Sequence, residues 1–152
     1  MEEILLEFQF GIGKYATQTG NLSRCLLAIF DMALGGEAEY LENATIDHIE
    51  AQSKTLGYTS ESEKPAKDVI NSLGNLALLE KRFNVSGPKF NGNHENNGDW
   101  HVKRETYLKS KFESTKRTAE NHKTWTEKDI KDEGKTRAKV IVDQLSLKPE
   151  NL

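Results

Sequence analysis

The chain has 152 residues, a length that suits one domain with a single hydrophobic core. Hydrophobic residues make up 36% and charged residues 30%. No apolar run reaches the roughly 18 residues of a membrane helix, and the N-terminus MEEILLEFQF is acidic where a secretory signal would be basic. Cys25 is the only cysteine, which excludes an internal disulfide and a multi-cysteine zinc site. We therefore expect a cytoplasmic protein that does not enter a membrane.

The formal net charge of −3 conceals an asymmetry along the chain. Residues 1–63 hold 3 Lys/Arg and 11 Asp/Glu, whereas residues 64–152 hold 18 and 13. Residues 101–123 contain 7 basic and 3 acidic side chains, a composition that fits a phosphate-facing surface. Taken alone, this charge pattern is explained more simply by a solvated helix face of mixed charge.

The first half of the chain predicts one helix and one short strand. The helix covers residues 21–34, with Asn21 as its N-cap and the Gly35-Gly36 pair as its end. Its apolar positions recur at helical spacing and include Cys25, which we expect in the core. The segment 44–46 has strand character, and a long polar connection follows it.

The second half predicts another short strand and more helices. Gly74 indicates a turn before a strand over residues 76–79, and a short helix follows. We expect a loop over residues 85–100, a helix over about 100–116, and a last helix over about 126–145 that begins at Thr126. The predicted fold is mostly α with a small central β-hairpin.

Four polar side chains surround the two predicted strands. Asp47 offers a hard carboxylate, and His48 an imidazole that can be neutral at pH 7 and accept a proton from water. Asn75 lies 27 residues after His48, and Asn84 lies 9 residues further on. Because neighbours on a strand point to opposite faces, we expect the strand to end or bulge at the Asp47–His48 pair.

These residues resemble the motif of HNH nucleases of the ββα-metal type. The resemblance is carried by Asp47-His48-Ile49, by Gly74-Asn75-Leu76 with Leu78-Leu79, and by Asn84. It implies a ββα-metal core embedded in a helical domain. We place this core at about residues 40–90 of a single domain spanning 1–152.

A longer stretch is similar to the C-terminal HNH domain of GmrSD-type, modification-dependent restriction endonucleases. There a Lys-x3-Tyr-x2-Ser pattern follows the core, and here it is Lys103, Tyr107 and Ser110. A late "WTEKDI" also fits, and the resemblance covers roughly residues 40–145. It implies a metal-dependent endonuclease that hydrolyses phosphodiester bonds in duplex DNA as part of anti-phage restriction, with a companion NTPase-like domain or subunit.

The resemblance also implies a role for each site residue. His48 would be the general base, and Asn75 would fix the turn near it. Asp47 and Asn84 would bind one divalent cation, and oxygen ligands favour Mg²⁺ or Mn²⁺. The expected DNA contacts are Lys89, Lys103 and Arg104. We expect Trp100 and Trp125 in the core, and His122 in solvent.

Two alternatives stay open on the sequence. The chain could be a catalytically inactive nucleic-acid-binding module that keeps the HNH scaffold. It could also be a module that docks onto an NTPase partner through the acidic segment 1–63.

Overall fold

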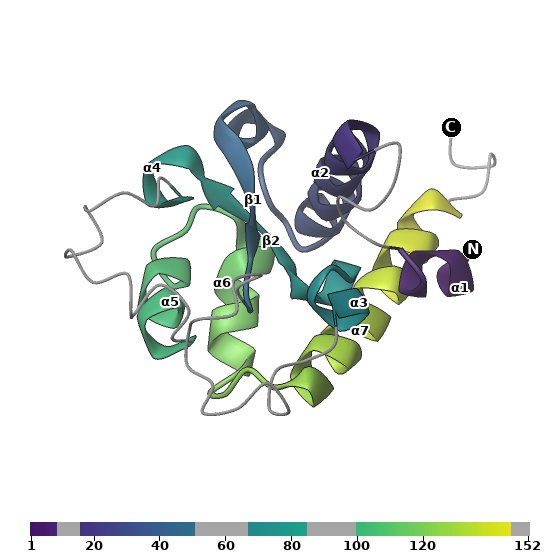
Figure 1. Ribbon diagram of the computed structural model, residues 1–152. Helices are drawn as coiled ribbons and strands as arrows, with labels where there is room; N and C mark the ends of the chain where they lie inside the picture. The colour runs from purple at the N-terminus through teal and green to yellow at the C-terminus, as the bar shows by residue number, and fades with distance from the viewer. Residues whose placement is uncertain (9–15, 51–66, 85–99, 147–152) are drawn as a thin grey trace.

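The computed structural model describes residues 1–8, 16–50, 67–84 and 100–146 (Figure 1). Lys89 and the rest of the predicted loop at 85–99 lie outside these residues. In chain order the elements are α1 (Glu2–Leu6), α2 (Ala16–Ala33), the 3₁₀ turn η1 (Ala38–Asn43), β1 (Ala44–His48), α3 (Lys67–Ile70), the 3₁₀ turn η3 (Leu73–Asn75), β2 (Leu76–Glu80), α4 (Lys81–Asn84), α5 (Trp100–Tyr107), α6 (Glu113–Asn121) and α7 (Glu127–Leu145).

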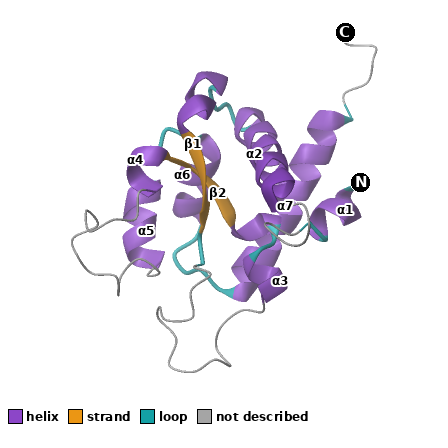
Figure 2. Ribbon diagram, turned by 45° about the horizontal axis from the view of Figure 1, so that its top comes forward, coloured by secondary structure: helices purple, strands orange, loops and turns teal. Residues whose placement is uncertain are grey.

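The two strands form one antiparallel pair at the centre of the helices. Ala44 lies opposite Glu80, and His48 lies opposite Leu76. Figure 2 shows α2 and α7 on one side of the pair, and α5 and α6 on the other. The prediction of a mostly helical fold around a small β-hairpin is therefore confirmed.

Strand β2 is buried on both faces, which explains the uninterrupted apolar sequence of its first four residues, 76–79. Leu76 and Leu78 pack into a core cluster with residues of α2 and α7. Ala77 and Leu79 point the other way, into a cluster that includes Tyr107, Trp100 and Trp125. The two tryptophans are each 9% exposed, as predicted for core residues. The strand thus separates two half-cores, and each is closed by helices.

Helix α2 differs from its prediction at its start. It begins at Ala16, so Asn21 lies inside the helix and is not its N-cap. Cys25 is exposed, so its predicted place in the core was wrong, because the buried face of α2 runs through Ser23, Leu26 and Phe30 instead. The predicted end is confirmed: Gly35 adopts a φ of 93°, a left-handed conformation that glycine tolerates.

Residues 100–116, predicted as one helix, form α5 and the first turn of α6, which continues to Asn121. The cause is the buried carboxylate of Glu80, at the end of β2. Its oxygens accept hydrogen bonds from Ser110 Oγ at 2.8 Å and from the Lys111 backbone N–H at 2.7 Å. The Ser110 hydroxyl in turn accepts from the N–H of Phe112. A distant side chain thus binds the backbone between the two helices and stabilises a turn there.

Helix α7 begins as predicted, with a capping box between Thr126 and Asp129. Gly134 lies at its middle and faces Gly74 of η3 across a close backbone contact. A Cβ added at Gly74 would stand 2.0 Å from the carbonyl oxygen of Ile130.

Among the described residues no helix, α7 included, has both the length and the apolar character needed to cross a membrane.

Gly74→Ala should destabilise the protein by about 1–3 kcal/mol, because the new methyl group would collide with the backbone of α7. Gly134→Ala is the matched control, since its Cβ would find its nearest neighbours at 3.6 Å, an ordinary contact. There alanine should be neutral or stabilising by up to about 1 kcal/mol through helix propensity. Urea unfolding measures both values, and equal effects of the two changes would contradict this account of the contact.

Candidate active site

Asp47 and His48 are the last two residues of β1, which therefore runs two residues beyond the predicted segment 44–46. Of the two expected possibilities, an end or a bulge at this pair, the structure shows an end. Their strand partners show where the side chains point. Asp47 lies opposite Ala77, which belongs to the half-core that contains Tyr107. His48 lies opposite Leu76, which belongs to the other half-core. The two side chains therefore leave opposite faces of the strand at its end.

The Asp47 carboxylate is held by two side chains of α5. Lys103 Nζ lies 3.1 Å from Asp47 Oδ2, and the Tyr107 hydroxyl donates to the same oxygen at 2.5 Å. Lys103 also donates to the backbone carbonyl of His48. Burial, with the nearby Asp47 charge, raises the pKa of Tyr107 well above 10, so the phenol is a neutral donor. Lys103 therefore provides the positive charge in this contact.

The His48 imidazole contacts Asn71, the residue that follows α3. Its Nε2 lies 3.3 Å from Asn71 Oδ1. Burial lowers the pKa of His48 below 6.5 and outweighs the opposing effects of the Asn71 hydrogen bond and the Asp47 charge. The neutral ring is thus favoured at pH 7, the state in which an imidazole can accept a proton.

Asn75 is fully buried and uses its whole side-chain amide. Its Oδ1 accepts from the Glu50 backbone N–H at 2.8 Å and from Trp125 Nε1 at 3.0 Å. Its Nδ2 donates to the carbonyls of Glu50 at 3.0 Å and Ile70 at 2.8 Å. These bonds hold the chain two residues after His48.

Of the residues predicted to contact DNA, Lys103 and Arg104 are bound to other groups of the protein. Arg104 Nε donates to the Ala119 carbonyl at 2.7 Å, which ties α5 to α6, and Lys103 is engaged with Asp47. Asn84 is the last residue of α4, a helix that packs against both strands, and the position of its side chain is not described. Lys89 is outside the described residues. Within the described ranges no three His, Cys, Asp or Glu side chains form a group able to hold a metal ion.

Sequence reasoning assigned no role to Asn71, Tyr107 or Trp125 in supporting the site. The signal for Tyr107 was present, because the Lys-x3-Tyr spacing places two side chains one helical turn apart on one face. Both reach the same carboxylate oxygen of Asp47. Nothing comparable in the sequence marked Asn71 or Trp125, because their partners come from segments 23 and 50 residues away.

His122 was predicted to lie in solvent, and this was wrong. Its Nε2 lies 3.2 Å from Glu133 and its Nδ1 lies 3.6 Å from Asp129, with 17% of the side chain exposed. Glu133 also accepts from the buried Arg137 at 2.9 Å. Burial would raise the pKa of Glu133, but Arg137 and His122 lower it to about 2. A charged cluster therefore joins α6 to α7.

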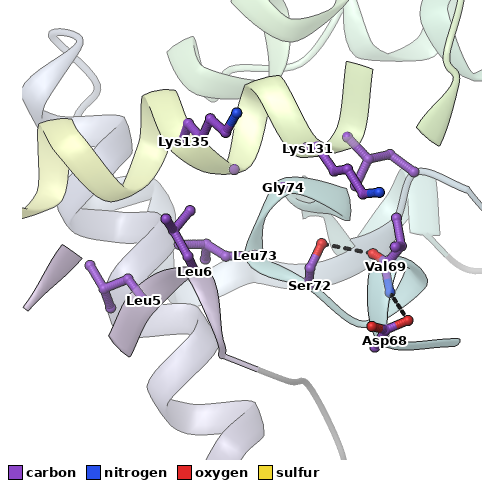
Figure 3. Close-up of a pocket in the computed structure, with 11 residues that line it drawn as sticks. Leu5, Leu6, Asp68, Val69, Ser72, Leu73, Gly74, Lys131 and Lys135 are labelled. Atoms are coloured by element: carbon purple, nitrogen blue, oxygen red, sulfur yellow. Dashed lines mark hydrogen bonds between the residues drawn. The ribbon is translucent and has the colours of Figure 1, made fainter. Parts of the chain in front are cut away.

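A separate pocket of about 290 Å³ lies between α1, the α3–η3 segment and α7 (Figure 3). Its wall is mainly apolar, with Leu5, Val69 and Ile130, and Lys131 and Lys135 also line it. None of the predicted site residues lines this pocket.

The first strand of the antiparallel pair ends in Asp47-His48, a short helix follows the second strand, and larger helices enclose both. This is the arrangement that the resemblance to HNH nucleases implied. The sequence matches the family model of the C-terminal domain of GmrSD restriction endonucleases over residues 4–140. The chain belongs to this family. Neither the comparison with curated proteins nor the comparison with solved structures gave a match.

His122→Gln should remove a pH-dependent part of the stability. The hydrogen bond to Glu133, with the Asp129 charge, raises the pKa of His122 above 6.5, so the folded chain binds this proton more tightly than the unfolded chain. The contribution is fully present below pH 6.5 and is lost as the pH rises through the raised pKa.

The free energy of urea unfolding, measured from about pH 5.5 to 9, should therefore differ most between wild type and His122→Gln at the acidic end. Asn43→Gln, at an exposed position of η1, exchanges no titratable group; it is the control and should show no such trend. A difference that grows with pH would contradict the raised pKa.

Proposed function

We propose that this chain is a metal-dependent endonuclease that hydrolyses phosphodiester bonds of duplex DNA. The observation that carries the proposal is the Asp47–His48 pair at the end of β1, in a chain of a restriction endonuclease family. A phosphodiester lying across this strand end would have Asp47 on one side and His48 on the other. The opposite directions of the two side chains suit different roles in one reaction.

A divalent cation fits the donor chemistry at Asp47, since a partly exposed carboxylate is the oxygen ligand that Mg²⁺ and Mn²⁺ prefer. Asp47 and Asn84 would hold it, and Asn84 is placed on a helix that packs against β1. When bound, the cation would offset the negative charge that develops on the phosphate and the leaving oxygen.

His48 would act as the general base and take a proton from the attacking water. Its lowered pKa favours the neutral form needed for this step. Asn71 would orient the ring through Nε2, and Asn75 would fix the backbone that follows. Lys89, Lys103 and Arg104 are the proposed DNA contacts, and for Lys103 and Arg104 this requires release from their present partners.

We also propose a biological setting that rests on the family. The chain would supply the cutting activity of a system that restricts invading phage DNA. A companion NTPase-like domain or subunit would select the target DNA. Binding of this chain to the NTPase-like domain or subunit in the absence of DNA would support this partnership.

Plasmid nicking with Mg²⁺ or Mn²⁺ tests the proposed activity. His48→Ala should lower the rate by about 10²–10⁴-fold, because it removes the base but leaves the strand intact. Asp47→Ala and Asn84→Ala should also abolish most of the activity, and excess EDTA should stop the wild type. His101→Ala is the matched histidine control and should cut at the wild-type rate.

Cleavage that survives His48→Ala, or that persists in EDTA, would overturn the proposal. Salt-sensitive DNA binding without nicking under either metal would instead identify an inactive binding module. Circular dichroism of each variant checks that the loss of activity does not come from unfolding.

The cleavage rate should fall at acidic pH, with its midpoint below pH 6.5, because burial lowers the pKa of His48. Asn71→Asp should move this midpoint upward, since a carboxylate against Nε2 stabilises the protonated ring. Asn43→Asp, at an exposed position of η1, adds the same charge and should leave the midpoint unchanged. A midpoint that does not move in Asn71→Asp would contradict the proposed contact.

A further inference from the structure

Lys103 lies where it neutralises the carboxylate that would bind the cation. Its Nζ is 3.1 Å from Asp47 Oδ2, and it also donates to the carbonyl oxygen of His48. The side chains of Lys103 and Asp47 are 15% and 16% exposed, so solvent screens this pair only in part. Two anchors on β1 hold the ammonium group in one place.

No other cation takes this place among the residues described near Asp47. Tyr107 donates to the same oxygen, but its buried phenol is uncharged. Arg104, the next residue along α5, turns to the Ala119 carbonyl. A carboxylate this poorly solvated is costly without a positive partner, and Lys103 is that partner.

A divalent cation at Asp47 would bind the same carboxylate that Lys103 neutralises. Both present contacts fall on Oδ2, so a cation approaching the carboxylate meets the Lys103 ammonium close by. If Lys103 stays in place, the two positive charges repel each other. If its flexible side chain moves away, its ion pair with Asp47 is lost. In either case part of the binding free energy of the cation is lost.

We propose that Lys103 is a resident counter-ion of Asp47 that competes with the divalent cation and sets the affinity of the site for it. This inference rests on the proposed function, because it takes Asp47 to be a ligand. The site would stay charge-balanced without metal and would load only at sufficient cation concentration. Lys103, once displaced, would be free to contact the phosphate that arrives with DNA.

The test is the affinity for Mn²⁺ without DNA, measured by electron paramagnetic resonance of the free ion. Lys103→Met keeps the side-chain length but removes the charge, and should bind Mn²⁺ about tenfold more tightly than wild type, the effect of a unit charge roughly 6 Å away even in a water-like dielectric. Lys103→Arg keeps the charge and should stay within about threefold of wild type. Asp47→Asn should lose this binding.

Lys109→Met is the matched control for net charge, because Lys109 is exposed just after α5, and its affinity should equal that of wild type. If Lys103→Met does not fold, as judged by thermal unfolding, Lys103→Gln gives the same neutral test and can still donate to the His48 carbonyl. An affinity of the neutral variant equal to or weaker than wild type would overturn the proposal. So would an equal gain in Lys103→Arg, or Mn²⁺ binding in neither wild type nor the neutral variant.

Plasmid nicking separates this inference from the proposed function. Nicking that depends on His48, together with an unchanged Mn²⁺ affinity in Lys103→Met, would reject the counter-ion role alone. A tighter Mn²⁺ site in a chain that never cuts DNA would reject the nuclease alone.

Discussion

The four hydrogen bonds of Asn75 are the constraint on which the rest of the site depends. An amide side chain offers two donors and two acceptor positions, and here all are used by buried groups. They connect the backbone after β1, the end of α3 and the indole of Trp125, just before α7. Loss of the amide would leave several buried polar groups unpaired at once, each costing about 1–3 kcal/mol. The end of β1 is therefore fixed by segments from three parts of the chain.

Helix α7 contacts the same turn from the other side, through Arg137 and through its own backbone. Arg137, 1% exposed, donates to the carbonyls of Leu73 and Leu76 on either side of Gly74 and Asn75. Gly74 brings the turn against the α7 backbone, where a side chain would not fit. The Gly-Asn sequence thus has a packing explanation for its first residue and a hydrogen-bonding explanation for its second. Arg137 can be buried because Glu133 balances its charge.

Local patterns were enough to predict the presence of both strands and the capped start of α7, although β1 runs two residues further than the predicted 44–46. Each depends on residues close together in the sequence. The break between α5 and α6 could not be predicted in this way, because its cause is the carboxylate of Glu80, 30 residues before Ser110. The prediction that His122 lies in solvent was wrong for the same reason. Its local sequence is polar, and its partner Glu133 lies on the next helix. Long-range polar contacts, rather than hydrophobic periodicity, account for what the sequence analysis missed.

The adjacency of Asp47 and His48 gives the two side chains different electrostatic surroundings within one strand end. The pleat sends Asp47 toward α5, where Lys103 supplies a positive charge and Tyr107 a neutral hydrogen bond. It sends His48 toward Asn71, where burial favours a neutral ring. A carboxylate with a cationic partner and an uncharged imidazole can then lie one residue apart. A pair of residues on the same face would share one environment and could not be tuned so independently.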